Sequence, residues 1–463
     1  MRFTEKGLGV PTDLKKDALG LIHSLAMGVA GSAPSFSISA TMATLIGSVG
    51  VLAPASLLYC GLIMLGIVFA YAHLNAYAPD AGASYAWVSE IFGRTPGFFA
   101  GWTLLVSSAL FMVSATLPAG SATLLLISPD LAESQAAVTA CALFWLLAVT
   151  LLIIKGIGLT GRVQAVMTAC ELAILAAVTI TAIVQFGPHA LHSISWHDFF
   201  PTAFSPSSFA NGAVIALFLF WGWDVSLNLT EETRNPNQVP GFGAVGAMLV
   251  IMAAFTAFSM VALLSLGDDE ISRSGTNIIF AVADKLFPRP WSYLAVLALM
   301  LSTIGTLETS MLQFSRTMYA KSRNGSLHLR WSRVHQEWRT PHDATLLIAA
   351  IGTALLLTSL ASDGIAQVMK DSINIIGVQA AYYYGLAGFA CAWQFRRRAL
   401  SSACAFLTML VWPVGSALVL WWAAAMTALA FDWATATLAL GSLLLGFIPL
   451  IRWRTRIDQT PDQ

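Results

Sequence analysis

The sequence predicts an all-α protein that crosses a membrane many times, and three observations lead to this prediction. Over 463 residues, 57% of the side chains are apolar and only 10% are charged, whereas soluble proteins carry about 25% charged residues. The apolar residues form runs of about 20, the length that a helix needs to cross a bilayer. Two of these runs are interrupted by glycine, proline or a carboxylate. Lipid cannot solvate a charge or unpaired backbone groups, so such breaks are expected only where they line a cavity.

Twelve apolar runs are expected to be membrane-spanning helices. All but four of the 24 lysines and arginines lie at the termini or in connections on one side; the four are Arg273, Lys285, Arg289 and Lys370. The excess of positive charge places both termini in the cytoplasm, so a multi-pass protein of the cytoplasmic membrane is expected. The expected spans are residues 18–47, 52–77, 96–127, 135–154, 163–186, 208–230, 241–266, 290–319, 343–360, 365–393, 402–428 and 432–451.

The two interrupted runs are the first and the sixth. The first contains two glycines and Pro34 within residues 28–35, and the sixth contains Trp221-Gly222-Trp223-Asp224. Proline removes a backbone donor and clashes with the preceding turn, so the first helix should break or kink there. Corresponding breaks in two five-helix halves are typical of inverted-repeat transporters. The alternative is a pair of ordinary kinked helices that pack through small residues.

The expected organisation follows from this pattern. Residues 18–393 form a ten-helix core, and two further helices follow at 402–451. The core divides into repeats at about 18–186 and 208–393, and short cytoplasmic tails at 1–17 and 452–463 complete the chain.

Four motifs in chain order are similar to those of one known family. They are Gly31-Ser32-Ala33, Pro79-Asp80-Ala81-Gly82-Ala83-Ser84-Tyr85-Ala86-Trp87, Glu231-Glu232-Thr233-Arg234-Asn235-Pro236, and Ser315-Arg316-Thr317-Met318-Tyr319-Ala320. Together they resemble the amino acid–polyamine–organocation superfamily. The resemblance implies a LeuT-like fold with a 5+5 inverted repeat, and it implies that amides of the first span receive a substrate carboxylate while carbonyls of the sixth receive the amine.

One departure from that family affects the expected chemistry. The family's Gly-Ser-Gly turn is replaced by Gly31-Ser32-Ala33-Pro34-Ser35. Helix amino termini favour anions through their free N–H groups, and Pro34 has none to give. An amine without an α-carboxylate therefore becomes an alternative substrate, although the hydroxyls of Ser32 and Ser35 remain possible donors.

The candidate substrate site lies at the two breaks. The resemblance implies that one of the sixth-span aromatics covers the substrate as a gate. Aromatic faces attract an ammonium group, and Asp224 could pair with it. The alternative for the aromatic side chains is ordinary packing. The resemblance implies that Val29, Ser32, Ala33, Phe218 and Trp221 bind substrate, and the predicted set is completed by Ser35, Gly222, Asp224 and Glu308.

Buried carboxyl groups provide candidate proton carriers. The resemblance implies that Glu171 in the fifth span lies near the position where some proton-coupled members of the superfamily have a lysine, and a carboxyl group in low dielectric readily holds a proton. Glu171 and Asp224 are therefore the predicted coupling acids. The alternative for Glu171 is a protonated side chain that bridges helices, and the alternative for Asp224 is a structural partner for a buried hydroxyl. Glu231 and Glu232 are expected to hold an inner gate through Arg162, Arg234 or Arg316, with solvated ion pairs as the alternative.

The predicted function is secondary active transport of amino acids or related amines by alternating access, with proton symport preferred. Sodium symport, substrate exchange and a non-transporting sensor are the alternatives. No catalytic motif or nucleotide-binding loop is present, so the chain is not expected to be an enzyme. No cofactor, metal or nucleic-acid partner is expected, since the five cysteines have no paired spacing and the net charge is zero.

Overall fold

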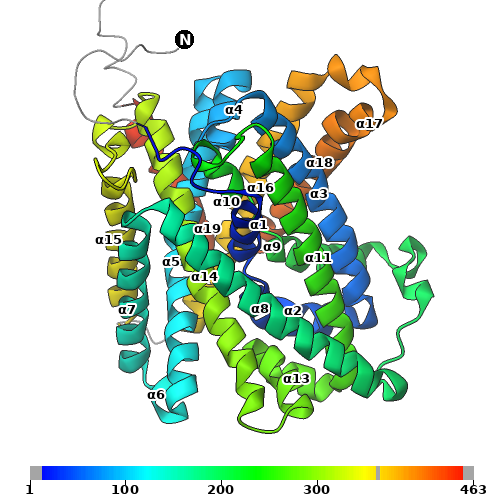
Figure 1. The fold of residues 1–463 in the computed structure, drawn as a ribbon. Helices are drawn as coiled ribbons and strands as arrows, with labels where there is room; N and C mark the ends of the chain where they lie inside the picture. Colours follow the sequence, from blue (N-terminus) through cyan, green and yellow to red (C-terminus); the bar gives the residue numbers. More distant parts are fainter. Residues whose placement is uncertain (1–12, 361–364, 452–463) are drawn as a thin grey trace, which may run out of the picture.

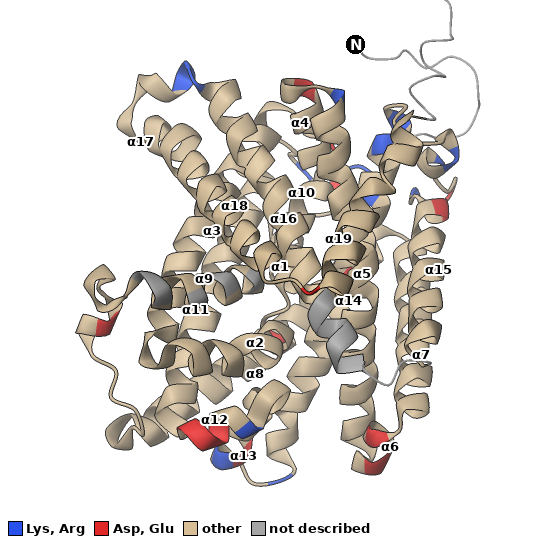
Figure 2. Ribbon diagram, turned by 180° about the vertical axis from the view of Figure 1, so that it is seen from behind, with Lys and Arg blue, Asp and Glu red and all other residues tan. Residues whose placement is uncertain are grey.

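The computed structural model describes residues 13–360 and 365–451, except for the side chains of residues 206, 207, 211, 214, 218 and 365–371. Helices make up nearly all of this part of the chain (Figure 1). Ten helical segments in it are long and apolar enough to cross a membrane. Figure 2 shows the charged residues mainly at the two ends of the bundle, with few along the middle. The protein is therefore an all-helical, multi-pass membrane protein.

The break expected in the first span is present. Helix α1 (Leu21–Ser32) ends at Ala33, whose φ of 46° is left-handed, and α2 (Pro34–Val49) starts at the proline. Proline suits the first position of a helix, because the N–H that it lacks would be unpaired there. The 21–77 segment continues through η1 (Gly50–Leu52) and α3 (Ala53–Tyr77).

The sixth span is also interrupted. Helix α9 (Pro206–Leu219) ends before the Phe220–Asp224 stretch, where Gly222 has a φ of 101°. A single turn, α10 (Val225–Asn228), and η5 (Thr230–Glu232) follow. The chain therefore does not form the continuous helix over 208–230 that an unbroken apolar run would give.

The other helices pack around these two segments. Figure 1 shows α1, α9 and α10 in the interior of the bundle, with α3, α5, α8, α11, α14 and α16 around them. Their bounds are α4 (Ser84–Phe92), α5 (Arg94–Ile127), α6 (Pro129–Glu133), α7 (Gln135–Ile154), α8 (Ile157–Phe186), α11 (Val239–Ser265), α12 (Asp268–Ser274), α13 (Ile278–Leu286), α14 (Leu294–Arg323), α15 (His342–Ser359), α16 (Ile365–Phe395), α17 (Ala403–Phe406), α18 (Trp412–Leu429) and α19 (Trp433–Leu444).

The bundle has two distinct ends. The N-terminal end carries the start of the described chain and α4, and the opposite end carries α6 and α13 (Figure 1). The connection between α8 and α9 contains three short 3₁₀ helices, η2 (Gly187–His189), η3 (Trp196–Phe199) and η4 (Pro201–Ala203). The span expected at 402–428 contains α17, a π-helical turn at Leu407–Val411 and α18.

Candidate functional site

The two helix breaks touch each other through glycine. A Cβ atom on Gly31 would overlap the carbonyl oxygen of Gly222 and lie 2.8 Å from its carbonyl carbon. A Cβ atom on Gly222 would overlap the carbonyl oxygen of Gly31 in the same way. Thr306 of α14 donates a hydrogen bond of 3.2 Å to the Gly31 carbonyl. The breaks therefore meet in the interior of the bundle and do not face lipid.

The amino terminus of α2 is held by two other helices. The backbone N–H of Ser35 donates to Oε1 of Glu171 on α8 at 2.9 Å, and that of Phe36 donates to the hydroxyl of Ser302 on α14 at 3.2 Å. The Glu171 side chain is buried. A carboxylate at a helix amino terminus satisfies an unpaired donor and complements the helix dipole. Glu171 therefore lies at the first break, close to where the sequence placed the substrate site.

Asp224 forms the centre of a polar network next to the second break. The hydroxyl of Tyr384 donates to Oδ1 at 2.7 Å, and Nε2 of Gln313 donates to Oδ2 at 2.7 Å. Tyr384 also accepts the Gly222 N–H at 3.3 Å and stacks on Trp223 with ring centroids 5.4 Å apart. Asp224 is fully buried. Its carboxylate is held by neutral donors on α14 and α16, so it can carry either a charge or a proton.

A cavity of about 850 Å³ leads from the opposite end of the bundle to the second break. Its inner part is lined by Trp221 and Tyr384, and its outer part reaches Glu133 at the end of α6 and Thr276 in η6 (Gly275–Asn277). Trp221 is fixed by a 2.8 Å hydrogen bond from its Nε1 to the Tyr383 hydroxyl and by an edge-on contact with Phe111. Because Tyr384 both lines the cavity and donates to Asp224, it connects the cavity to the buried carboxylate.

The predicted site residues divide into three groups. Trp221 lines the cavity, whereas Val29, Ser32, Ala33 and Ser35 are buried next to the first break and Gly222 and Asp224 lie at the second. Phe218 belongs to α9, but its side chain lies outside the described residues. These assignments to substrate contact remain predictions.

Glu308 is a buried carboxyl group of α14. It is not among the described residues that line the cavity, and neither of its buried carboxyl oxygens has a hydrogen-bond partner in the described part of the chain. Thr306 marks the face of α14 that points to the first break. At 100° per residue, Glu308 lies about 200° around the helix from Thr306. Glu308 therefore lies on a different face of α14 from Thr306, and its contact with substrate stays a prediction.

Sequence reasoning missed four residues of the site. Ser302 and Gln313 are polar residues in α14, and Tyr383 and Tyr384 end a run of three tyrosines in the middle of α16. The run of tyrosines was the available signal, because a buried tyrosine hydroxyl needs a partner. Nothing in the sequence indicates that this partner is Asp224.

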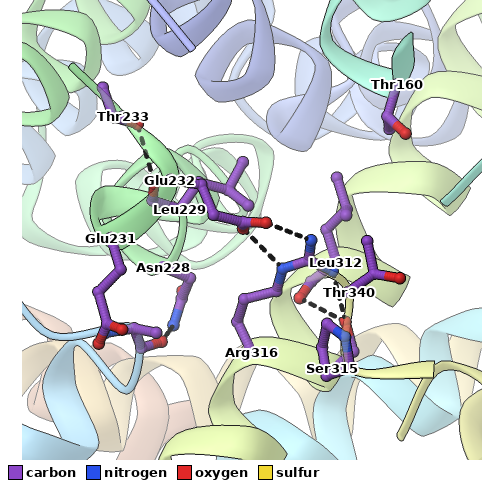
Figure 3. A network of polar contacts seen from close by, with 12 residues as sticks. Thr160, Asn228, Leu229, Glu231, Glu232, Thr233, Leu312, Ser315, Arg316 and Thr340 are labelled. Atoms are coloured by element: carbon purple, nitrogen blue, oxygen red, sulfur yellow. Dashed lines mark hydrogen bonds and ion pairs between the residues drawn. The ribbon is translucent and has the colours of Figure 1, made fainter. Parts of the chain in front are cut away.

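The N-terminal end of the bundle is closed by a buried ion pair. Arg316 donates through Nε and a terminal nitrogen to the two carboxylate oxygens of Glu232, each at 2.9 Å, and both side chains are fully buried (Figure 3). Arg316 is one of the three partners that the sequence suggested. Of the other two, Arg234 donates its Nε–H to the backbone carbonyl of Asp17 instead.

Glu231 has a partner that sequence reasoning did not name. Arg323 donates to its carboxylate oxygens at 2.7 and 2.8 Å, and it donates to Asp80 at 3.0 Å. Burial raises the pKa of Asp80 to about 6, and the positive charge of Arg323 opposes this rise. We call the group Asp80, Glu231 and Arg323 the lock. It joins the loop after α3, the segment after α10 and the end of α14.

The lock is connected to Asp224 by hydrogen bonds. Gln313, which donates to Asp224, also donates to Asn228 at 3.3 Å. Asn228 in turn donates to the Ala81 carbonyl at 2.9 Å, and the Ala81 N–H donates to Glu231 at 2.9 Å. A rearrangement at the break therefore has a direct structural route to the lock.

Replacing Arg323 by glutamine is expected to open the lock, since Asp80 and Glu231 would then lie together without a cation. The population with the cavity open to the opposite end should fall. A cysteine replacing Thr41, which lines the cavity, should therefore react about fivefold more slowly with a thiol reagent, as expected for a shift of roughly 1 kcal/mol. The measurement uses purified protein in which the native cysteines are replaced.

Arg330→Gln is the matched control for this experiment. Arg330 pairs with Asp343 at 3.4 Å and its side chain is 58% exposed, so its loss should leave the labelling rate unchanged. Equal labelling of the Arg323→Gln and unmodified proteins would show that the lock does not bias the conformation.

Two interrupted membrane helices that meet beside a cavity, with ion pairs closing the other end, define a membrane transporter site. The chain belongs to the amino acid permease family, whose profile matches residues 19–451. Membership makes it a transporter of that family and not an enzyme. The resemblance to the amino acid–polyamine–organocation superfamily is thereby confirmed.

Three relatives illustrate the range of similarity. The serine/threonine exchanger SteT of Bacillus subtilis is 23% identical over 73% of this chain and 74% of its own. The branched-chain amino acid permease BcaP of Lactococcus lactis is 24% identical over 51% of this chain and 53% of its own. The human large neutral amino acids transporter small subunit 2 is 26% identical over 73% of this chain and 62% of its own. The alignments thus cover between about half and three quarters of these relatives.

Proposed function

We propose that the chain is a secondary transporter that moves amino acids or related amines by alternating access. In this proposal it has twelve spans, with a 5+5 inverted repeat over residues 18–186 and 208–393 and two added helices at 402–451. The observation that carries it is the contact of the two helix breaks at Gly31 and Gly222 beside a cavity that reaches the opposite end of the bundle. The arginine-rich N-terminal end would face the cytoplasm, which favours insertion into the cytoplasmic membrane with both termini inside.

Proton symport is the coupling that we propose, with Glu171 and Asp224 as the coupling acids. Glu171 supports this because its carboxylate accepts the Ser35 N–H at the first break. Gain or loss of a proton there would change how firmly α8 holds the start of α2. Asp224 supports it because it is bonded to Tyr384, which lines the cavity. Sodium symport and substrate exchange are the alternatives, and SteT is named an exchanger.

Replacing Glu171 by glutamine tests this coupling. Glutamine can still accept the Ser35 N–H through its carbonyl oxygen but cannot carry the proton. In liposomes, accumulation driven by a pH gradient should fall to background, whereas exchange of labelled for unlabelled substrate should continue. Glu337→Gln, an exposed carboxyl in a loop, is the control and should accumulate normally.

Two results would contradict the proton proposal. If Glu171→Gln accumulates substrate as the unmodified chain does, Glu171 is only a structural bridge. If a sodium gradient drives uptake equally well with the pH clamped on both sides, sodium symport replaces proton symport.

A further inference from the structure

We infer that the substrate of this site is a cationic amine without a free α-carboxylate group. The inference rests on the proposed transport function and specifies its substrate class. The reason lies in the backbone groups at the two breaks: the amides at the start of α2 are already used by the protein, whereas carbonyls at the end of α9 are not. The hydroxyls of Ser32 and Ser35 have no partner among the described residues, but neither residue lines the cavity.

Every backbone N–H in the first turn of α2 already donates a hydrogen bond within the protein. Pro34 has no N–H. The Ser35 N–H donates to Glu171, and the Phe36 N–H donates to Ser302. The next amide, that of Ser37, donates to the Ala33 carbonyl at 2.8 Å. Since buried amides are normally paired, this turn is a completed structure with no amide left for a ligand anion.

A substrate carboxylate would have to displace Glu171 from this turn. Displacement would leave two carboxylates next to one helix terminus in a low-dielectric interior, and like charges there repel strongly. Glu171 thus occupies the position that a substrate carboxylate would take, and it is attached to the protein, so it acts as an internal anion.

The cavity itself supplies no replacement cation. Among its described lining residues there is one carboxylate, Glu133, and no lysine or arginine. The buried cations of α14 lie toward its end and are engaged there: Arg316 binds Glu232, and Nζ of Lys321 donates to the Phe98 carbonyl at 2.7 Å. An α-carboxylate entering the cavity would therefore be desolvated without an ionic partner, which is costly.

The acceptor side has backbone carbonyls without a partner. Within the described part of the chain, no hydrogen bond reaches the carbonyl oxygens of Leu219, Phe220 and Trp221, where α9 ends. The carboxylate of Asp224 is bonded to a hydroxyl and an amide but to no cation. Carbonyl groups at a helix carboxyl terminus and a buried carboxylate both favour positive charge.

Aromatic and hydroxyl groups of the cavity fit the same ligand. Phe36, Trp221 and Tyr384 line it, and aromatic faces attract ammonium groups. Ser39 also lines the cavity; the residue is 4% exposed, and its hydroxyl has no hydrogen-bond partner among the described residues. A hydroxyl without a partner can accept a hydrogen bond from an amine.

Binding of matched compounds tests the inference. The purified chain is titrated with phenethylamine, phenylalaninamide and phenylalanine, which share one side chain and differ in the carboxyl position. We expect the two cations to bind about 100-fold more tightly than phenylalanine, because only phenylalanine brings an unpaired carboxylate. Equal or tighter binding of phenylalanine would overturn the inference. It would also be overturned if none of the three compounds bound and aliphatic amines did not bind either.

Two variants test the roles given to the buried carboxyl groups. Glu171→Leu frees the Ser35 N–H and removes the internal anion, so the preference for phenethylamine over phenylalanine should fall about tenfold or more, the equivalent of 1.4 kcal/mol. Asp224→Asn should weaken amine binding without improving phenylalanine binding. An unchanged preference in Glu171→Leu would overturn the role given to Glu171.

Flux in liposomes separates this inference from the proposed function. Amines that bind without being transported would contradict transport and leave the substrate class standing. Transport of phenylalanine with exclusion of the amines would contradict the substrate class and leave transport standing.

Discussion

Replacing Gly31 by alanine is expected to abolish transport and to lower stability. The added methyl group would overlap the Gly222 carbonyl oxygen and lie 3.2 Å from Cγ1 of Val225. These neighbours are backbone and a branched side chain, so they cannot move aside cheaply. We expect the free energy of unfolding to fall by about 3 kcal/mol or more and substrate flux in liposomes to drop to background, because the two breaks must separate to accommodate the methyl group.

Gly47→Ala is the matched control. Gly47 lies in α2, the helix that follows the same break, and nothing lies within 4 Å of the Cβ atom it would gain. Its replacement should keep transport and change stability by no more than about 1 kcal/mol, in the favourable direction that helix propensity gives alanine. Normal flux in Gly31→Ala would show that the two breaks need not touch for transport.

Replacing Arg316 by methionine is expected to give the largest loss of stability among charge changes. Glu232 would remain fully buried without its two charge-assisted hydrogen bonds. Removing one member of a buried pair costs about 3–5 kcal/mol, mostly because the remaining charge is uncompensated. Thermal unfolding in detergent measures the effect, and Arg289→Gln, which breaks a pair whose arginine is 66% exposed, should leave the transition in place.

The double replacement Arg316→Met with Glu232→Leu identifies the cause. If the uncompensated carboxylate is responsible, removing it should restore most of the lost stability, since buried ion pairs are often replaceable by apolar residues. A double variant as unstable as Arg316→Met would instead indicate that the shape of the arginine side chain is what the helices need.

The pattern of breaks could be predicted because its causes are local. Pro34 cannot continue the hydrogen bonds of α1, and Gly222 takes a φ of 101° that few other residues adopt. Those two constraints act within a few residues, so sequence alone placed both interruptions. The same reasoning identified Glu171 and Asp224, because a carboxyl in an apolar run has to be accommodated by the fold.

The partners of these carboxyls could not be predicted. Glu171 meets Ser35 across 136 residues, and Asp224 meets Tyr384 across 160. Glu231 and Glu232 were expected to share a set of arginines, yet Glu232 takes Arg316 and Glu231 takes Arg323, a residue outside that set. On consecutive positions of one turn the two side chains point in different directions, and only the packing of α14 against this segment selects the arginine that each one meets.

The sequence by itself determined that this chain is a helical membrane protein, where its helices break and which charged groups are buried. Length, apolarity, proline and glycine act along the chain, so they can be read from it. The tertiary structure decided that Glu171 occupies the start of α2, that Tyr384 links Asp224 to the cavity and that Thr306 of α14 meets the first break. Membrane helices are apolar on most faces, so their periodicity does not indicate which faces meet; that is settled by packing between distant segments.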